Sequence, residues 1–175
     1  MARWGHATHL VRRFAGMLWP GGPSPADEAW ATGALTPGET ALWRRMSGPD
    51  RRHAHGVARD VAERLGEGAT PPVLAAALLH DVGKVDSALG PVRRSLVTVA
   101  GIAAGHGRAR RWRTRGGVVG RAGRYLCHDE IGAQLLTEAS SDPLTVAWAR
   151  EHHLPRDRWS VPPAIGAALK AADDD

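Results

Sequence analysis

The residues best placed to do chemistry begin with a histidine and an aspartate that are adjacent in the chain, His80 and Asp81. They follow an apolar run, residues 74–79, that is typical of a buried helix. Burying an imidazole and a carboxylate costs free energy unless the groups are paired or bound to a metal ion. Together they offer a nitrogen and an oxygen ligand for a divalent ion. The pair therefore predicts a metal site at the end of this helix.

A second candidate ligand lies on the apolar face of the preceding predicted helix. His53 precedes Val57 and Val61 at steps of four, so the three side chains share one face. His55 is only two residues further on, about 200° round the helix, and should point outward. His53 is therefore the better candidate, despite the His-Ala-His spacing.

The last predicted helix ends in an aspartate on its apolar stripe. Asp173 follows Ile165 and Leu169 at steps of four. A carboxylate at a helix C-terminus is disfavoured by the helix dipole, by about 0.3–1 kcal/mol. A bound metal ion would offset that cost. The alternative is that residues 173–175 form a solvated acidic tail.

Three more histidines stand at the ends of predicted helices. His128 precedes Ile131 and Leu135 at helical spacing and can face inward, and His152 and His153 end the next helix. Taken singly, each is more often a structural histidine than a ligand. The whole set of histidines and aspartates at helix ends and on core faces is what indicates a metal site.

The apolar periodicity predicts helices along most of the chain. The expected helices span residues 39–46, 51–65, 73–80, 92–104, 129–139, 143–153 and 161–173. Proline and glycine predict a linker or loop over residues 20–38, and residues 105–124 are rich in glycine and arginine. Since no strand-like alternation of useful length occurs, we expect an all-α fold.

Length and composition fit one domain with a short extension. The chain has 175 residues, of which 43% are hydrophobic, enough to bury a core. We expect residues 1–40 to form an N-terminal amphipathic segment and linker, and residues 41–175 to form the metal-binding domain. The single cysteine, Cys127, excludes an intrachain disulfide and a cysteine zinc cluster.

Neither a signal peptide nor a membrane span is expected. Residues 1–20 are basic and amphipathic, without a continuous apolar run. The longest mildly apolar run, residues 96–105, is shorter than the roughly 20 residues that cross a bilayer. We therefore expect a cytoplasmic protein. Surface association through the first helix is the alternative to ordinary packing of that helix.

Arginine dominates the positive charge. The net charge is +5, and every basic residue other than Lys84 and Lys170 is an arginine. The planar guanidinium binds phosphate in a bidentate way, which favours anionic partners. A compositional bias of the genome explains the same excess without any ligand.

The densest group of arginines lies within residues 105–124. The candidate ligands for a substrate phosphate there are Arg108, Arg110, Arg111 and Arg113. A solvated loop without a ligand explains this stretch equally well. Trp112 among the arginines would also suit a nucleic-acid surface with one stacking ring. No nucleic-acid recognition motif accompanies it.

Three segments together resemble the HD-domain superfamily of metal-dependent phosphohydrolases. They read Arg-His-Ala-His-Gly-Val-Ala over residues 52–58, Ala-Leu-Leu-His-Asp-Val-Gly-Lys over residues 77–84, and Ala-Asp at 172–173. The superfamily pattern is a histidine, a later His-Asp pair and a distal aspartate. The resemblance covers about residues 50–175 and implies an HD-type helical bundle. It also implies a first divalent ion held by His53, His80, Asp81 and Asp173.

The remaining histidines extend the resemblance. Residues 127–133 and the pair His152–His153 resemble the extra histidines of binuclear HD proteins, such as the HD-GYP phosphodiesterases and bacterial diadenosine tetraphosphate hydrolases. This implies a second ion held by His128 with His152, His153 or both, and bridged by Asp81. Lys84 matches the HD-x-G-K extension and would face phosphate.

Two departures narrow the resemblance. Residues 154–157 read Leu-Pro-Arg-Asp in place of the glutamate and the Gly-Tyr-Pro signature, which argues against cyclic di-GMP as substrate. Pro49 stands where some relatives carry a further acidic ligand, so a third ion is not expected.

These observations predict a metal-dependent hydrolase of a phosphate ester or anhydride, with a nucleotide or phosphodiester as substrate. Asp81 and Lys84 are the expected catalytic residues, working with one or two divalent ions that lower the pKa of a water molecule and neutralise phosphate charge. The sequence does not distinguish iron, manganese, nickel, zinc and magnesium, nor does it indicate an oligomeric state. The alternatives are a di-iron oxygenase on the same scaffold and a nucleotide-sensing module that does not turn over.

Overall fold

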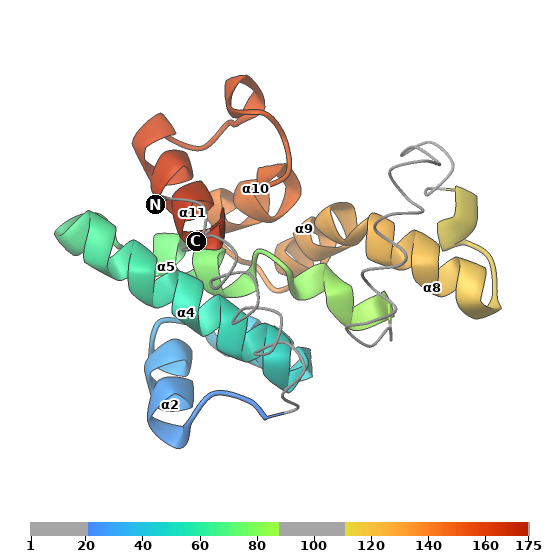
Figure 1. The fold of residues 1–175 in the computed structure, drawn as a ribbon, viewed down its shortest axis with the longest axis horizontal. Coiled ribbons are helices and arrows are strands. Elements are labelled where there is room, and N and C mark those ends of the chain that lie inside the picture. The colour runs from blue at the N-terminus through green and yellow to red at the C-terminus, as the bar shows by residue number, and fades with distance from the viewer. Residues whose placement is uncertain (1–20, 88–110, 175) are drawn as a thin grey trace, which may run out of the picture.

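The chain folds into a bundle of short helices, shown in Figure 1. The computed structural model describes residues 21–87 and 111–174, and every regular element among them is helical. The α-helices are α2 (Pro25–Gly33), α3 (Pro37–Arg45), α4 (Gly48–Leu65), α5 (Pro71–Leu79), α8 (Gly117–Leu126), α9 (His128–Glu138), α10 (Pro143–Glu151) and α11 (Pro163–Asp174). Three 3₁₀ segments join them: η1 (Gly66–Gly68), η2 (Val82–Ser87) and η3 (Arg156–Arg158). The all-α prediction is confirmed.

The predicted linker over residues 20–38 is wrong where α2 forms. Ser24 caps this helix by accepting a hydrogen bond from the Asp27 backbone, and the Asp27 carboxylate accepts one from the Ser24 backbone. Thr36 and Glu39 make the same reciprocal pair at the start of α3. Proline in the first turn is compatible with a helix, because its missing N–H has no intrahelical partner there. These capping boxes mark the starts of helices in a segment whose proline and glycine content alone predicts a loop.

The core is built around α5, whose side chains from Val73 to Leu79 are almost all fully buried. α5 packs against both α4 and α10, and α4 packs in turn against α11. On the α4 side, Ala54 and Ala58 are fully buried, and such small side chains let two helices approach closely. This packing brings the His53 turn of α4 next to the end of α5.

α8 lies at one end of the molecule and runs back toward the bundle (Figure 1). It packs on η2 and α9. The arginine-rich stretch is therefore helical from Gly117 onward, and the solvated-loop alternative is wrong over that part. The helix predicted over residues 92–104, together with Arg108 and Arg110, lies outside the described residues. None of the described helices is long and apolar enough to cross a membrane.

Candidate metal centre

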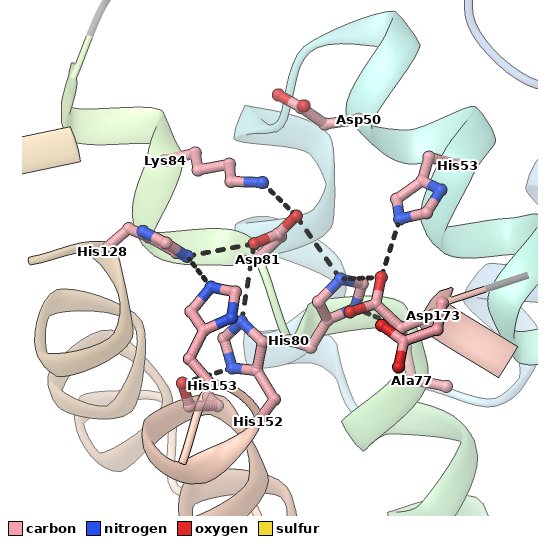
Figure 2. A network of polar contacts seen from close by, with 12 residues as sticks. Asp50, His53, Ala77, His80, Asp81, Lys84, His128, His152, His153 and Asp173 are labelled. Carbon is pink, nitrogen blue, oxygen red and sulfur yellow. Dashed lines mark hydrogen bonds and ion pairs between the residues drawn. The ribbon is translucent and has the colours of Figure 1, made fainter. Parts of the chain in front are cut away.

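The histidines and aspartates predicted as ligands meet in one place between the helices (Figure 2). Each comes from a different part of the fold, mostly from a helix end. The positions are His53 in the second turn of α4, His80 and Asp81 just after α5, His128 at the first position of α9, His152 and His153 just after α10, and Asp173 in the last turn of α11. Helix packing thus gathers ligands that are up to 120 residues apart in the chain.

The first ligand group consists of His53, His80 and Asp173. Their ligand atoms all lie within 4.8 Å of one another. Asp173 Oδ1 lies 3.2 Å from His53 Nε2 and 3.6 Å from His80 Nε2. The acidic-tail alternative is therefore wrong for Asp173, whose side chain is only 16% exposed.

The second ligand group consists of His128, His152 and His153, whose ligand atoms also lie within 4.8 Å of one another. His128 Nε2 and His153 Nε2 are 3.2 Å apart. His128 and His152 are buried, whereas His153 is exposed at the edge of the cluster. The sequence left open whether His152 or His153 joins His128, and both lie within reach of it.

Asp81 lies between the two ligand groups. Its Oδ2 is 3.4 Å from His80 Nε2 in the first group. Its Oδ1 is 3.2 Å from His128 Nε2 and 3.8 Å from His152 Nε2 in the second. The residue is 7% exposed, so the carboxylate is enclosed by these imidazoles. One side chain therefore faces both groups.

Three of the histidines have one ring nitrogen fixed by the backbone. In each, Nδ1 lies close to the carbonyl oxygen three residues earlier: His80 to Ala77 at 2.9 Å, His128 to Tyr125 at 2.7 Å, and His152 to Ala149 at 3.0 Å. A carbonyl only accepts, so Nδ1 must donate, and in the neutral ring Nε2 then carries the lone pair. This backbone arrangement is the usual orientation of a metal-binding histidine.

The Nε2 atoms of His80 and His152 are buried and have no hydrogen-bond partner. Although Asp81 approaches both, neither contact has hydrogen-bonding geometry. A buried polar atom without a partner costs about 1–3 kcal/mol. Both atoms point into the cluster, where a cation would satisfy them. The donor set therefore fits a divalent metal ion.

The charges of the first ligand group are balanced by protons in the metal-free protein. Burial lowers the pKa of His80, but the carboxylates of Asp81 and Asp173 more than offset this and raise the pKa to about 9. Burial raises the pKa of Asp173, yet the hydrogen bond with His53 and the charge of His80 bring it below the usual range. At neutral pH the group therefore holds an imidazolium beside its carboxylates.

In the second ligand group, His152 and His153 are neutral instead. Burial lowers the pKa of His152 well below its ordinary value, and the nearby His80 lowers it further. Burial and the neighbouring His128 lower the pKa of His153 to about 4. These imidazoles therefore present free lone pairs at neutral pH.

Lys84 completes the charge balance of the centre. Its ammonium group donates to Asp81 Oδ2, and its side chain is 17% exposed. Burial lowers the pKa of Lys84, but the Asp81 carboxylate outweighs that effect and raises it. Burial likewise raises the pKa of Asp81, whereas Lys84 and His80 hold it well below its usual range. The Asp81 carboxylate thus stays ionised and the Lys84 ammonium stays charged.

Two neighbours of the cluster were not predicted from the sequence. Asp50 lies one turn before His53 on α4, on the same side of the cluster as Lys84 (Figure 2), and its charge also raises the pKa of Lys84. Tyr125 stacks on the His128 ring with centroids 5.8 Å apart. Asp50 precedes His53 by three positions on one helix, and that helical spacing was the signal that could have identified it. Tyr125 lies on α8 and His128 on α9, so no such signal marks Tyr125.

Gly83 fixes the distance between η2 and α9. A Cβ at this position would lie 1.9 Å from the His128 carbonyl oxygen and 2.6 Å from the Gly132 nitrogen. Only glycine permits so close an approach of two backbones. The approach holds Asp81 and Lys84 against the start of α9, where His128 lies.

His55 does not join the cluster, as predicted, but it is not directed to solvent. Its ring packs edge-on against Trp30 of α2, with centroids 5.3 Å apart, and its Nε2 lies 3.6 Å from Asp27. The outward-pointing prediction is wrong because α2 covers this face of α4. Burial beneath α2 lowers the pKa of His55.

The arginines proposed for substrate phosphate remain a prediction. Arg113 lies 3.5 Å from the Glu130 carboxylate on α9, and Arg111 is exposed.

Comparison with protein-family models, with curated proteins and with solved structures found no match for this chain. A function for this centre must therefore be inferred from the chemistry of its own side chains.

Proposed function

We propose that this chain is a metal-dependent phosphohydrolase of the HD type, acting on a phosphate ester or anhydride at a centre for two divalent ions. The observation that carries the proposal is the pair of three-residue ligand groups joined by one buried aspartate. Paired metal ions bridged by a carboxylate are a recurrent arrangement in phosphoester hydrolases.

The two ions would be held by different helices. The first ligand group would hold one ion and the second group would hold the other, and Asp81, which faces both groups, would be shared between them. Five imidazoles and two carboxylates make a nitrogen-rich set. Such a set suits iron, nickel or zinc better than magnesium, which prefers oxygen ligands.

When bound, such ions lower the pKa of a water molecule and neutralise charge on phosphate oxygens. The chain supplies the remaining requirements. Asp81 holds the two ligand groups together and keeps its negative charge. The partly exposed ammonium of Lys84 would turn toward a phosphate oxygen and stabilise the charge that develops there. Substrate would enter beside His153, the exposed member of the cluster.

The substrate class follows from charge. A nucleotide or phosphodiester presents anionic oxygens that suit Lys84, and Arg113, which lies before α8 and beside Glu130 of α9, would contact a more distant phosphate. The chain carries a net charge of +5, which also favours an anionic substrate. Cyclic di-GMP is not proposed, because residues 154–157 lack the Gly-Tyr-Pro signature.

Elemental analysis of protein purified without chelator tests the metal centre. We expect about two ions per chain in the parent and about one each in His53→Ala and His128→Ala. His55→Ala is the matched control, because it removes a histidine of α4 that lies outside the cluster. No metal in the parent, even after reconstitution with iron, manganese or nickel, would overturn the proposal in favour of a nucleotide-sensing module.

Turnover of bis(p-nitrophenyl) phosphate and a panel of nucleotides by the same samples tests the reaction. We expect hydrolysis by the parent and by His55→Ala, and its loss in both ligand variants. A protein that carries about two iron ions, consumes oxygen and leaves every phosphate ester intact would instead be a di-iron oxygenase on this scaffold.

A further inference from the structure

A basic hairpin with an apolar tip projects from the molecule at the end farthest from α2 and α4 (Figure 1). It consists of residues 111–116 and the helix α8. The six consecutive residues from Thr114 to Val119 are all exposed. Val118 is 63% exposed and Val119 44%, and these two are the exposed large hydrophobic residues of the described segments. Adjacent aliphatic side chains at a protruding tip commonly mark a binding surface.

Two glycines make the hairpin tight. A Cβ on Gly120 would lie 1.8 Å from the Arg115 carbonyl oxygen, and one on Gly123 would lie 2.4 Å from the Arg113 nitrogen. The backbone before α8 therefore lies directly on the helix. These contacts pack the segment before α8 against the helix.

The hairpin carries positive charge only. Between residues 111 and 126 the sequence has no aspartate or glutamate and contains the arginines Arg111, Arg113, Arg115, Arg121 and Arg124. Arg115 is exposed at the tip, and in the chain Gly116 and Gly117 separate it from the two valines. Cations flanking exposed aliphatic side chains match the two layers of an anionic bilayer surface, which are phosphate headgroups above hydrocarbon.

We propose that this hairpin docks the protein onto an anionic lipid bilayer. Val118 and Val119 enter the headgroup–hydrocarbon boundary, and Arg115 with Arg121 contacts lipid phosphates. A single-stranded nucleic acid is the less fitting partner, because such surfaces expose aromatic rings for base stacking. The exposed apolar groups here are aliphatic, and Trp112 is half-buried against α8. This docking role is independent of the proposed hydrolase activity.

Vesicle flotation of the full chain tests the proposal. The probes are vesicles of phosphatidylcholine alone and of phosphatidylcholine with about one third phosphatidylserine. We expect binding to the anionic vesicles only, weakening as salt is added. Val118→Ser with Val119→Ser should lower the partition coefficient roughly tenfold, because two side chains lose their apolar insertion. Arg115→Gln with Arg121→Gln should lower it about fivefold for each arginine.

The matched control is Arg156→Gln with Arg158→Gln, which removes the same charge from the exposed segment η3. It should bind as the parent does, apart from a small loss of general attraction. Circular dichroism and the thermal midpoint should show that all variants fold. Equal binding by parent and hairpin variants, no binding to anionic vesicles, or displacement of the protein by a single-stranded oligonucleotide would each overturn the proposal.

Discussion

The two ligand groups of the centre differ in the charge that they hold before any metal binds. The first group contains a carboxylate and compensates it with a proton, since the pKa of His80 is raised to about 9. The second group consists of imidazoles only, and the pKa of His153 is lowered to about 4. The first group therefore balances its charge with a proton, whereas His152 and His153 in the second group present neutral lone pairs. A cation should bind to His152 and His153 without first displacing a proton from them.

Asp81 links the two groups, so its replacement should have the largest effect. In Asp81→Asn the side chain keeps its shape but loses the charge that both groups face. We expect both ions to be lost and turnover to fall by about a thousandfold or more. Elemental analysis and phosphodiester turnover measure the two effects. Asp157→Asn, an exposed aspartate on η3, is the control, and retention of both ions by Asp81→Asn would show that this residue does not bridge the groups.

Variants that disable one ligand group at a time should have the next largest effect on metal binding and turnover. His53→Ala should abolish binding of one ion and leave the second group loaded, and His128→Ala should do the reverse. Each variant should lose turnover by about a hundredfold or more, because both ions would contact the phosphate in the proposed reaction. Metal titration by calorimetry should resolve one site in each variant and two in the parent. Loss of both ions in either variant would mean that the groups act as one site.

Replacing Gly83 should affect the second ligand group more than the first, because Gly83 packs against the start of α9. In Gly83→Ala the new Cβ collides with the His128 carbonyl oxygen, so η2 must move away from α9. We expect the free energy of unfolding to fall by about 2–3 kcal/mol, with weaker binding at the second group than at the first. Urea unfolding with and without metal measures both effects.

The control for Gly83 is Gly56→Ala, at an exposed position inside α4 where an added Cβ meets nothing within 4 Å. That change should raise stability by about 0.5–1 kcal/mol, because alanine favours the helix. Equal stability of the two alanine variants would contradict the close approach of η2 and α9.

The smallest expected effect is a difference between the two groups in how their metal affinity changes with pH. His80 keeps its proton up to about pH 9, so an ion entering the first group must displace it. Affinity there should rise about tenfold per pH unit from neutrality toward that value. His152 and His153, whose pKa values are lowered, are already neutral, so affinity of the second group should change little.

The two single-site variants allow this comparison. His128→Ala should report the first group and His53→Ala the second, each titrated with metal at about pH 7 and at about pH 8.5. Calorimetry in buffers of different ionisation enthalpy should detect proton release only for the first group. The same pH slope for both variants would remove the distinction in charge between the groups.

Most helices of the bundle could be predicted from the sequence, because apolar periodicity is local and survives packing. The predicted element over residues 51–65 corresponds to α4, which starts earlier at Gly48. The prediction failed at α2, where proline and glycine were interpreted as linker although Ser24 and Asp27 form a capping box. The prediction that His55 points outward also failed, because nothing near that residue in sequence indicates that α2 covers it.

The sequence by itself determined the all-α class and the residues of the candidate centre, since histidine and aspartate at apolar helix faces are visible one helix at a time. The resemblance to HD proteins implied two groups with Asp81 between them, and the tertiary structure gives the distances of that arrangement. Only the tertiary structure decided that Asp50 and Tyr125 lie beside the groups. These relations join residues on different helices. They depend on how closely α4, α5 and α9 pack, which is set by small residues such as Ala54 and Gly83 whose packing partners lie elsewhere in the chain.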